Sequence, residues 1–280
     1  MTDVRETSAS ATTQQARSGP NPTGDFIWYE LMTTDPEEAK AFYDAVIGWD
    51  VEPKPTGEQP MDYRMIRRSD GGNAGGVLRI DGDMAAHGAR PTWLGYVNVP
   101  DVDATTASIE QAGGKTLMAT DIAGVGRIAM VTDPQGAPFY VMKPNPPEGD
   151  PNAKSDVFDT KAEQRIGWNE LSTSDPVAAR RFYGEQFGWT SEQFMPMGEH
   201  GEYRFLEQNG VTIGAVAGTM DGQQPHWRFY IRVPSISKAK EAVEANGGKI
   251  ATGPMEVPGG DHILIGVDPQ GAEFALVGQA

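Results

Sequence analysis

The chain has 280 residues, a formal net charge of −16 and an isoelectric point near 4.6. This acidity disfavours nucleic acid and anionic membranes as partners, because both carry negative charge. The absence of cysteine excludes disulfides, thiol catalysis and thiolate metal ligands. No apolar run approaches the roughly 20 residues of a membrane-spanning helix, and the N-terminus lacks an apolar signal core. We therefore expect a cytoplasmic protein with two domains of ordinary size.

The chain divides by composition into four segments. Residues 1–24 are rich in Thr, Ser, Ala and Gln and have no hydrophobic periodicity, which predicts a disordered N-terminal tail. Residues 25–145 form a predicted first domain, and residues 164–280 form a second. The segment 146–163 between them is rich in Pro, Asp and Lys and is typical of a linker.

The segment from Trp28 to Trp49 occurs twice in the chain. Its pattern Trp-x-Glu-Leu-x-Thr-x-Asp-Pro, followed by Phe-Tyr and Gly-Trp, returns between Trp168 and Trp189 with a constant offset of 140 (168 − 28). So many matched positions indicate a true internal repeat. Each copy predicts a strand, a turn with an Asp N-cap and Pro at the first helical position, and an amphipathic helix that ends at Gly.

The rest of the first copy continues with short strands and one further helix. Strands are predicted at 63–67, 75–80, 93–99, 126–131 and 139–142, a helix at 101–111, and a loop at 81–91. The second copy follows the same order, but its offset falls to 134 at Trp227 (227 − 93), so the preceding loop is shorter by six residues (140 − 134). Each copy contains the order βαβββ twice. This order predicts two curved, mainly antiparallel sheets with helices outside and a concave cavity inside.

These features together resemble the vicinal oxygen chelate superfamily, which includes glyoxalase I, bleomycin-resistance proteins and extradiol dioxygenases. The residues that carry the resemblance are the repeated Trp-x-Glu-Leu-x-Thr-x-Asp-Pro start, the Phe-Tyr and Gly-Trp pairs, and the closing Asp-Pro-x-Gly turn. The nearest resemblance is to two-domain actinobacterial proteins of the 27 kDa antigen and hydroxylase group. It implies an α+β fold of two tandem glyoxalase-like domains, each made of paired βαβββ units that form a curved sheet around a cavity. The fold hosts several chemistries, so function has to be argued from the site.

The resemblance also implies where a metal would be bound. Metal enzymes of the superfamily place His, Gln or Glu on the first strand, the strand opening the second half, and the last strand of a domain. Here these positions fall at Trp28, near Leu94 and at Tyr140, and in the second copy at Trp168, near Arg228 and at Ala275. None is a usual ligand, so no metal or other cofactor is expected. A shift of two residues on the same face brings in Glu170, His226 and Glu273, which leaves a divalent metal as the alternative.

Three residues are the candidate catalytic groups. Glu30 and Glu170 each lie two residues after a Trp, on the same strand face, which is expected to line the cavity. Burial there raises the pKa of a carboxyl into the range that suits general acid–base catalysis. The alternative is a structural carboxylate paired with backbone or Arg. His226 is the third candidate. Because Thr92 stands at its position in the first copy, the second domain is favoured as the one that retains chemistry.

A cavity rich in aromatic side chains suits a flat organic ligand. The predicted ligand-binding residues are aromatic residues on the strands, one arginine that can hold a carboxylate and one histidine present only in the second copy. They are Trp28, Trp93, Tyr63 and Tyr140 in the first copy, and Trp168, Trp227, Tyr203, Arg228 and His262 in the second. For the tryptophans, packing in the core is the alternative.

Three functions remain open from the sequence. The first is a lyase or isomerase that acts on a small organic molecule by acid–base chemistry, with Glu170 as the proton-transfer group. The second is a protein that binds and sequesters such a molecule without turnover, as drug-resistance members do. The third is an interaction protein that has lost ligand function. A monomer or a homodimer fits each of them.

Overall fold

The computed structural model describes residues 20–57, 61–219 and 222–280. The predicted tail therefore lies mostly outside the described residues. Its last part is held in place: Asn98 donates a hydrogen bond to the Asn21 carbonyl at 2.7 Å, and the Trp189 indole donates to the Gly24 carbonyl at 2.9 Å. Because Trp189 belongs to the second domain, residues 21–24 contact both domains.

The first domain contains two βαβββ units in chain order. The first unit is β1 (Phe26–Thr33), α1 (Pro36–Ile47), β2 (Asp50–Val51), β3 (Tyr63–Arg67) and β4 (Asn73–Arg79). A short helix, α2 (Gly82–Ala86), follows within the segment 81–91 that was expected to be loop throughout. The second unit is β5 (Thr92–Asn98), α3 (Val102–Gln111), β6 (Lys115–Ile122), β7 (Gly126–Thr132) and β8 (Pro138–Pro144).

The second domain repeats this order. It contains β9 (Ile166–Thr173), α4 (Pro176–Phe187), β10 (Phe194–Pro196), the 3-10 turn η1 (Gly198–His200), β11 (Glu202–Gln208) and β12 (Val211–Gly218). The second unit follows with β13 (His226–Val233), α5 (Ile236–Ala245), β14 (Lys249–Glu256), β15 (His262–Val267) and β16 (Glu273–Gly278). The predicted tandem α+β architecture is confirmed.

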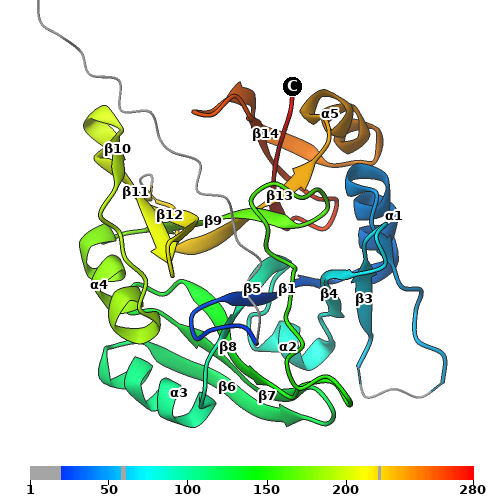
Figure 1. Ribbon diagram of the computed structural model, residues 1–280. Coiled ribbons are helices and arrows are strands. Elements are labelled where there is room, and N and C mark those ends of the chain that lie inside the picture. Colours follow the sequence, from blue (N-terminus) through cyan, green and yellow to red (C-terminus); the bar gives the residue numbers. More distant parts are fainter. Residues whose placement is uncertain (1–19, 58–60, 220–221) are drawn as a thin grey trace, which may run out of the picture.

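Each domain is one eight-stranded mixed sheet, with the order β2-β3-β4-β1-β5-β8-β7-β6 in the first and β10-β11-β12-β9-β13-β16-β15-β14 in the second. The centre of each sheet is the antiparallel pair formed by the opening strands of its two units, β1 with β5 and β9 with β13. The strands that carry the candidate catalytic residues Glu30, Glu170 and His226 therefore lie in the middle of the sheets (Figure 1).

The helices begin and end where the repeated motif predicts. The Asp35 carboxylate accepts hydrogen bonds from the backbone N–H groups of Glu37 and Glu38, both at 3.1 Å, which caps α1. Gly48 ends the helix in the left-handed region with φ of 77°, and Gly188 does the same for α4 with φ of 73°. The motif therefore fixes how each helix leaves its first strand.

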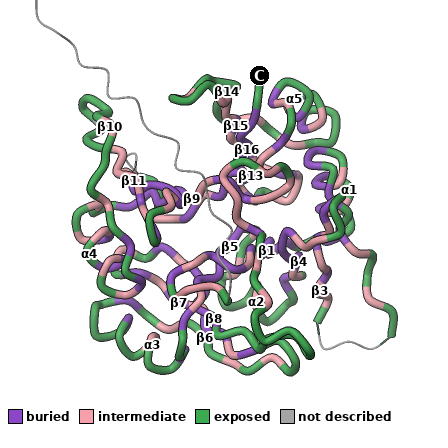
Figure 2. Tube along the Cα trace, in the orientation of Figure 1, coloured by how far each residue is buried: buried purple, intermediate pink, exposed green. Residues whose placement is uncertain are grey.

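The two sheets share one hydrophobic core. Side chains of the central strands that point toward the other domain, such as Tyr29, Leu31 and Phe229, are almost fully buried and form a single cluster across both domains. Figure 2 shows the buried segments of β1, β5, β9 and β13 at the centre of the molecule. We call this side of each sheet the core face, and the opposite side, which carries Trp28 and Glu30, the cavity face.

The domains are joined by reciprocal contacts. Helix α1 packs against α5, and α4 packs against α3 (Figure 1). The Tyr43 hydroxyl hydrogen-bonds to Asp268 at 3.1 Å, and the equivalent Tyr183 hydroxyl hydrogen-bonds to Asp133 at 3.2 Å. This arrangement joins the Phe-Tyr motif of each domain to the Asp-Pro-x-Gly turn of the other.

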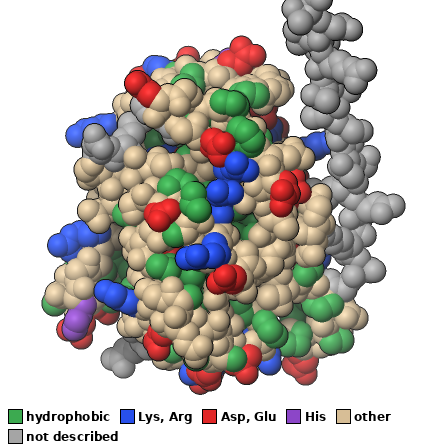
Figure 3. Space-filling model, turned by 90° about the vertical axis from the view of Figure 1, so that its left-hand side faces the viewer, with side chains coloured by type: hydrophobic (Ala, Val, Ile, Leu, Met, Phe, Trp, Pro, Cys, Tyr) green, Lys and Arg blue, Asp and Glu red, His purple; other side chains and the backbone are tan. Residues whose placement is uncertain are grey.

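Part of the predicted linker packs on the first domain, where Asp156 pairs with Arg68 at 2.7 Å and Val157 is buried. On the face shown in Figure 3, acidic and basic side chains are interspersed, so the acidic excess is not concentrated there. Within the described ranges, no helix has the length and apolar character needed to cross a membrane.

Candidate functional site

A cavity of about 1190 Å³ opens on the cavity face of the first domain. Its floor is formed by side chains of β1, β4, β5 and β8, among them Met32, Leu78, Leu94 and Tyr140. Strand alternation places these residues on one face of the sheet. The floor is apolar, so the cavity suits a ligand with extended apolar surface.

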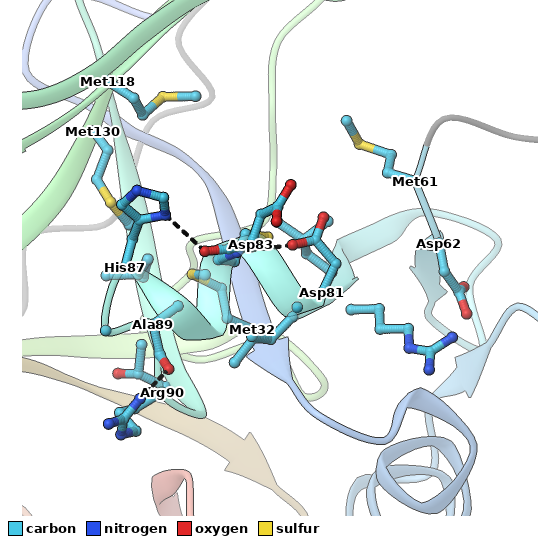
Figure 4. Close-up of a pocket in the computed structure, with 18 of the residues that line it drawn as sticks. Met32, Met61, Asp62, Asp81, Asp83, His87, Ala89, Arg90, Met118 and Met130 are labelled. Carbon is cyan, nitrogen blue, oxygen red and sulfur yellow. Dashed lines mark hydrogen bonds between the residues drawn. The ribbon is translucent and has the colours of Figure 1, made fainter.

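Residues 81–90 supply one wall of this cavity. The Asp81 carboxylate caps α2 by accepting from the Met84 N–H at 2.8 Å, and His87 Nδ1 lies 2.7 Å from the Asp83 carbonyl (Figure 4). Residues 80–91 join β4 to β5, whereas the shorter segment 219–225 joins β12 to β13. The longer connection is therefore what gives the first domain this wall.

Methionines are the second feature of the cavity lining. Figure 4 shows Met118 and Met130 beside His87, with Met61 across the opening and Met32 below. Unbranched thioether side chains adapt their shape to irregular or varied ligands. These residues and the 81–90 wall were not predicted from the sequence. The only sequence signal was the six-residue difference in loop length between the copies.

Glu30 lies beneath the floor of the cavity and is only 3% exposed. Leu94 is directly opposite it in the β1–β5 register, and Met32 is two residues further along the same face. The Tyr96 hydroxyl donates to Glu30 Oε2 at 2.9 Å, and the Tyr96 ring stacks on Tyr140 with 4.2 Å between centroids. Glu30 Oε1 has no hydrogen-bond partner among the described residues. This buried oxygen therefore has unused hydrogen-bonding capacity.

Burial raises the pKa of Glu30 from 4.5 to about 7, although the nearby hydroxyls of Tyr96 and Tyr63 favour the ionised form. Both protonation states are therefore populated near neutral pH. The protonated carboxyl can donate a hydrogen bond or a proton, and the carboxylate can accept one. Tyr63 also accepts a hydrogen bond from the Trp28 indole at 2.7 Å, which ties both predicted ligand-binding residues to this carboxyl.

The corresponding carboxyl of the second domain, Glu170, has a different environment. Its Oε1 accepts from Arg228 at 2.6 Å, and its Oε2 accepts from the hydroxyls of Tyr203 at 2.7 Å and Tyr230 at 3.2 Å. Tyr203 in turn accepts from the Trp168 indole at 2.8 Å. Both oxygens of Glu170 are satisfied, and its charge is balanced by a guanidinium.

His226 and Glu273 complete this polar network. Arg228 donates from Nε to Glu273 Oε1 at 2.7 Å, and His226 Nε2 lies 3.3 Å from the same oxygen. That hydrogen bond raises the pKa of His226. Burial opposes ionisation of Glu273, but hydrogen bonds from His226 and Arg228 outweigh it and lower the pKa of Glu273 to about 2. Four predicted or alternative site residues are thus brought together in one ion-pair network.

Trp93 and Trp227 lie in the core between the sheets and not on the cavity faces, which corrects the expectation that they line a cavity. Each is 5% exposed and belongs to the core between the sheets, where its indole donates at 3.0 Å to the hydroxyl of Tyr43 or Tyr183. Neighbours in a strand point to opposite faces. Since Leu94 and Arg228 face the cavity side, the adjacent tryptophans face the core.

His262, another predicted ligand-binding residue, does not lie on the cavity face either. On β15, Ile263 and Ile265 pack with the cavity-face residues of the second domain, whereas Leu264 belongs to the shared core. His262 therefore lies on the core side of the strand by alternation. Its Nδ1 is buried without a partner among the described residues, but it does not face the cavity side.

Replacement of Trp227 by alanine is expected to lower the free energy of unfolding by about 3–5 kcal/mol, because it removes a large buried side chain and leaves a cavity in the shared core. Urea unfolding of the variant measures this change. Trp168→Ala is the matched control. Trp168 is only partly buried on the cavity face, so its loss is expected to be smaller. Equal losses for the two variants would contradict the assignment of Trp227 to the core.

The residues at the superfamily's ligand positions do not fit a divalent metal. Trp28, Leu94 and Tyr140 offer no carboxylate or imidazole, and in the second domain Arg228 brings a positive charge. Within the described part of the chain, no group of three or more His, Cys, Asp or Glu is placed to hold a metal ion. The chemistry of the first domain therefore has to be derived from its own side chains.

Comparison with known proteins gives a consistent result. A sequence model of the Glyoxalase/Bleomycin resistance protein/Dioxygenase superfamily matches residues 26–141 and again residues 165–276. The chain is 29% identical over 266 residues to the anthracycline biosynthesis protein DauV of Streptomyces sp. (strain C5), and the match covers 89% of this chain and 91% of that protein.

Two solved structures show the same fold. The Mn(II)-bound glyoxalase from Novosphingobium aromaticivorans has a TM-score of 0.61 and 18% identity, with 92% of this chain and 83% of that chain covered. Homoprotocatechuate 2,3-dioxygenase from Brevibacterium fuscum, in complex with 3,4-dihydroxyphenylacetate, has a TM-score of 0.61 and 18% identity, with coverages of 92% and 82%. At such identities the likeness concerns the fold alone.

Proposed function

Since the chain belongs to the glyoxalase/bleomycin resistance protein/dioxygenase superfamily, we propose that its first domain binds a large, mainly apolar organic molecule and exchanges a proton with it through Glu30. The observation that carries the proposal is the buried Glu30 carboxyl, with one unpartnered oxygen and a pKa of about 7, beneath the apolar floor of the cavity. This combination of environment and position is typical of a catalytic acid or base.

The ligand class follows from the size and lining of the cavity. A volume of about 1190 Å³ exceeds the roughly 300–1,000 Å³ of common small-molecule sites. The apolar floor and the stacked tyrosine pair suit a polycyclic aromatic molecule, and polar side chains of the walls such as Asp81, Asp83 and Arg90 can contact its substituents. The relative DauV is named for anthracycline biosynthesis, which fits a polycyclic ligand of this kind.

The reaction that balances with these groups is a proton shift within the ligand. Ionised Glu30 takes a proton from a carbon next to a ligand carbonyl, and the electron pair moves onto the carbonyl as an enolate. The protonated Glu30 then returns the proton to another carbon or to the oxygen. No oxidant or reductant is consumed, so the reaction is an isomerisation. It is a lyase reaction if the enolate instead expels a leaving group from the adjacent carbon, which departs with its bonding electron pair and takes the proton from Glu30. Proton transfer of this kind contributes about 10²–10⁴-fold to rate.

A second function, binding without turnover, is favoured by the methionine-rich lining. Adaptable walls suit a protein that holds several related molecules. The two functions share the cavity and differ in whether Glu30 exchanges a proton with carbon. Proton exchange into deuterated solvent, followed by mass spectrometry of the ligand, separates them.

The cavity itself is tested with 1,4-dihydroxyanthraquinone as a polycyclic probe. Met130→Trp fills part of the cavity and is expected to weaken probe binding at least about tenfold, because a bulky ring occupies ligand volume. Ile265→Trp is the matched control, since Ile265 pairs with Ala275 as Met130 pairs with Tyr140. Fluorescence titration measures both affinities. An unchanged affinity in Met130→Trp, or an equal loss in both variants, would refute the location of the site.

A further inference from the structure

The second domain carries a cationic group where its candidate metal ligands converge. Glu170 of β9, His226 of β13 and Glu273 of β16 all contact the guanidinium of Arg228. Nη1 of Arg228 donates to Glu170 Oε1 at 2.6 Å, Nε donates to Glu273 Oε1 at 2.7 Å, and Nη2 lies 3.3 Å from His226 Nε2. Two carboxylates and one imidazole thus surround one fixed cation.

One pair of these groups, His226 and Glu273, has the spacing of two donors on a metal. His226 Nε2 and Glu273 Oε1 are 3.3 Å apart, and two donors on one tetrahedral zinc lie about 3.4 Å apart, given bond lengths of roughly 2.0–2.2 Å. The three side chains nevertheless do not form a group that could hold a metal ion, a property true of the whole described part of the chain. The guanidinium stands between Glu170 and the other two.

We infer that Arg228 is a built-in cation that takes the place of a divalent metal in the second domain. Its guanidinium balances both carboxylates and fixes their orientation through two charge-assisted hydrogen bonds. An entering metal ion would have to displace a partly buried cation from both partners and would be repelled by it. The second domain therefore does not bind divalent metals, and this property depends on one side chain.

The first domain provides an internal comparison. Leu94 stands at the position of Arg228, and Thr92 and Pro138 stand at the positions of the two further partners. The first domain thus lacks Arg228 and two of its three partners, His226 and Glu273. Only the glutamate on the first strand is common to both domains. This joint difference indicates that the four side chains of the second domain act as one unit.

The test compares divalent metal binding by the full chain and its Arg228→Leu variant. The paramagnetic resonance signal of free Mn²⁺ reports uptake, and thermal unfolding with and without Zn²⁺ reports stabilisation. The wild type is expected to take up no ion at this site. Arg228→Leu is expected to bind about one equivalent and to unfold at a higher temperature when the ion is present. Arg228→Leu with Glu273→Gln is expected to lose both effects.

Two further variants keep the outcome decisive. Arg204→Leu removes an arginine that pairs with Glu202 outside the network, and it controls for the change in net charge. Arg228→Gln preserves much of the side-chain volume and a neutral hydrogen-bonding group, and it replaces Arg228→Leu if that variant does not fold. The inference fails if folded Arg228→Leu or Arg228→Gln binds no more metal than Arg204→Leu. It also fails if the wild type binds an equivalent that Glu170→Gln abolishes, or if Glu273→Gln leaves the new binding intact.

Discussion

As the pH rises from 4.5 to 7, ionisation of Glu30 is expected to lower the free energy of unfolding of the wild-type chain by about 3 kcal/mol. The Glu30→Gln variant is expected not to show this loss. The folded-state pKa of about 7 lies above the ordinary 4.5, so the unfolded chain releases the proton first as pH rises. Below pH 4.5 both states are protonated and the loss is absent. Above pH 7 both are ionised and the loss is complete.

Urea unfolding of wild type and Glu30→Gln at pH 5 and pH 8 measures this difference. Glutamine mimics the protonated carboxyl, so the variant is expected to gain stability relative to wild type as pH increases. Glu170→Gln is the matched control. Its carboxylate is paired with Arg228, and loss of that pair is expected to destabilise the chain at pH 8. Parallel pH profiles for wild type and Glu30→Gln would show that Glu30 does not titrate in this range.

The same variant addresses the proposed chemistry. If Glu30 transfers a proton in the reaction, Glu30→Gln is expected to reduce exchange of ligand protons with solvent by about 10²–10⁴-fold, with affinity for the ligand largely kept. Higher stability at pH 8 combined with lower activity would be the mark of a buried carboxyl kept for function rather than for folding.

The fold could be predicted because the sequence contains an internal repeat. The constant offset from Trp28 to Trp49, with its Asp cap and terminal glycine, specifies the same strand–turn–helix unit in both halves. Alternation along the first strand also predicts correctly that Trp28, Glu30 and Met32 share a face. Local pattern is sufficient here because each of these features depends on residues close in the chain.

The composition of the site was less predictable. Trp93 and Trp227 were expected in the cavity together with Arg228, although adjacent residues of a strand cannot both face it. The 81–90 wall forms from a loop whose conformation no periodicity specifies. The sequence also does not predict how many partners a side chain has. The second domain has more ionisable candidates, but they pair with one another, as Glu170 does with Arg228. The carboxyl with an unpartnered oxygen, Glu30, is in the first domain.

We expect the residue opposite the glutamate, Leu94 in the first domain and Arg228 in the second, to control this difference between the domains. Leu94, which is 1% exposed, lies opposite Glu30 as Arg228 lies opposite Glu170. Leu94→Arg is expected to place a guanidinium on Glu30 and to lower the pKa of Glu30 from about 7 to below its ordinary range. Binding of the neutral polycyclic probe is expected to weaken at least about tenfold, because a charged side chain replaces part of the apolar floor.

Leu94→Arg and Glu30→Gln are expected to abolish the same stability loss between pH 4.5 and 7 for opposite reasons. Glutamine keeps the group neutral throughout, whereas arginine keeps the carboxyl ionised throughout. Infrared spectroscopy of the folded protein distinguishes the two variants. In Leu94→Arg the carboxylate band of Glu30 is expected to be fully present at pH 5.5, where wild-type Glu30 is still protonated. Leu94→Met is the control, because it conserves volume without charge and should leave both the titration and probe binding close to wild type. If Leu94→Arg retains a group that titrates near pH 7, the environment of Glu30 is not set by the residue opposite it, and the proposed difference between the two domains is wrong.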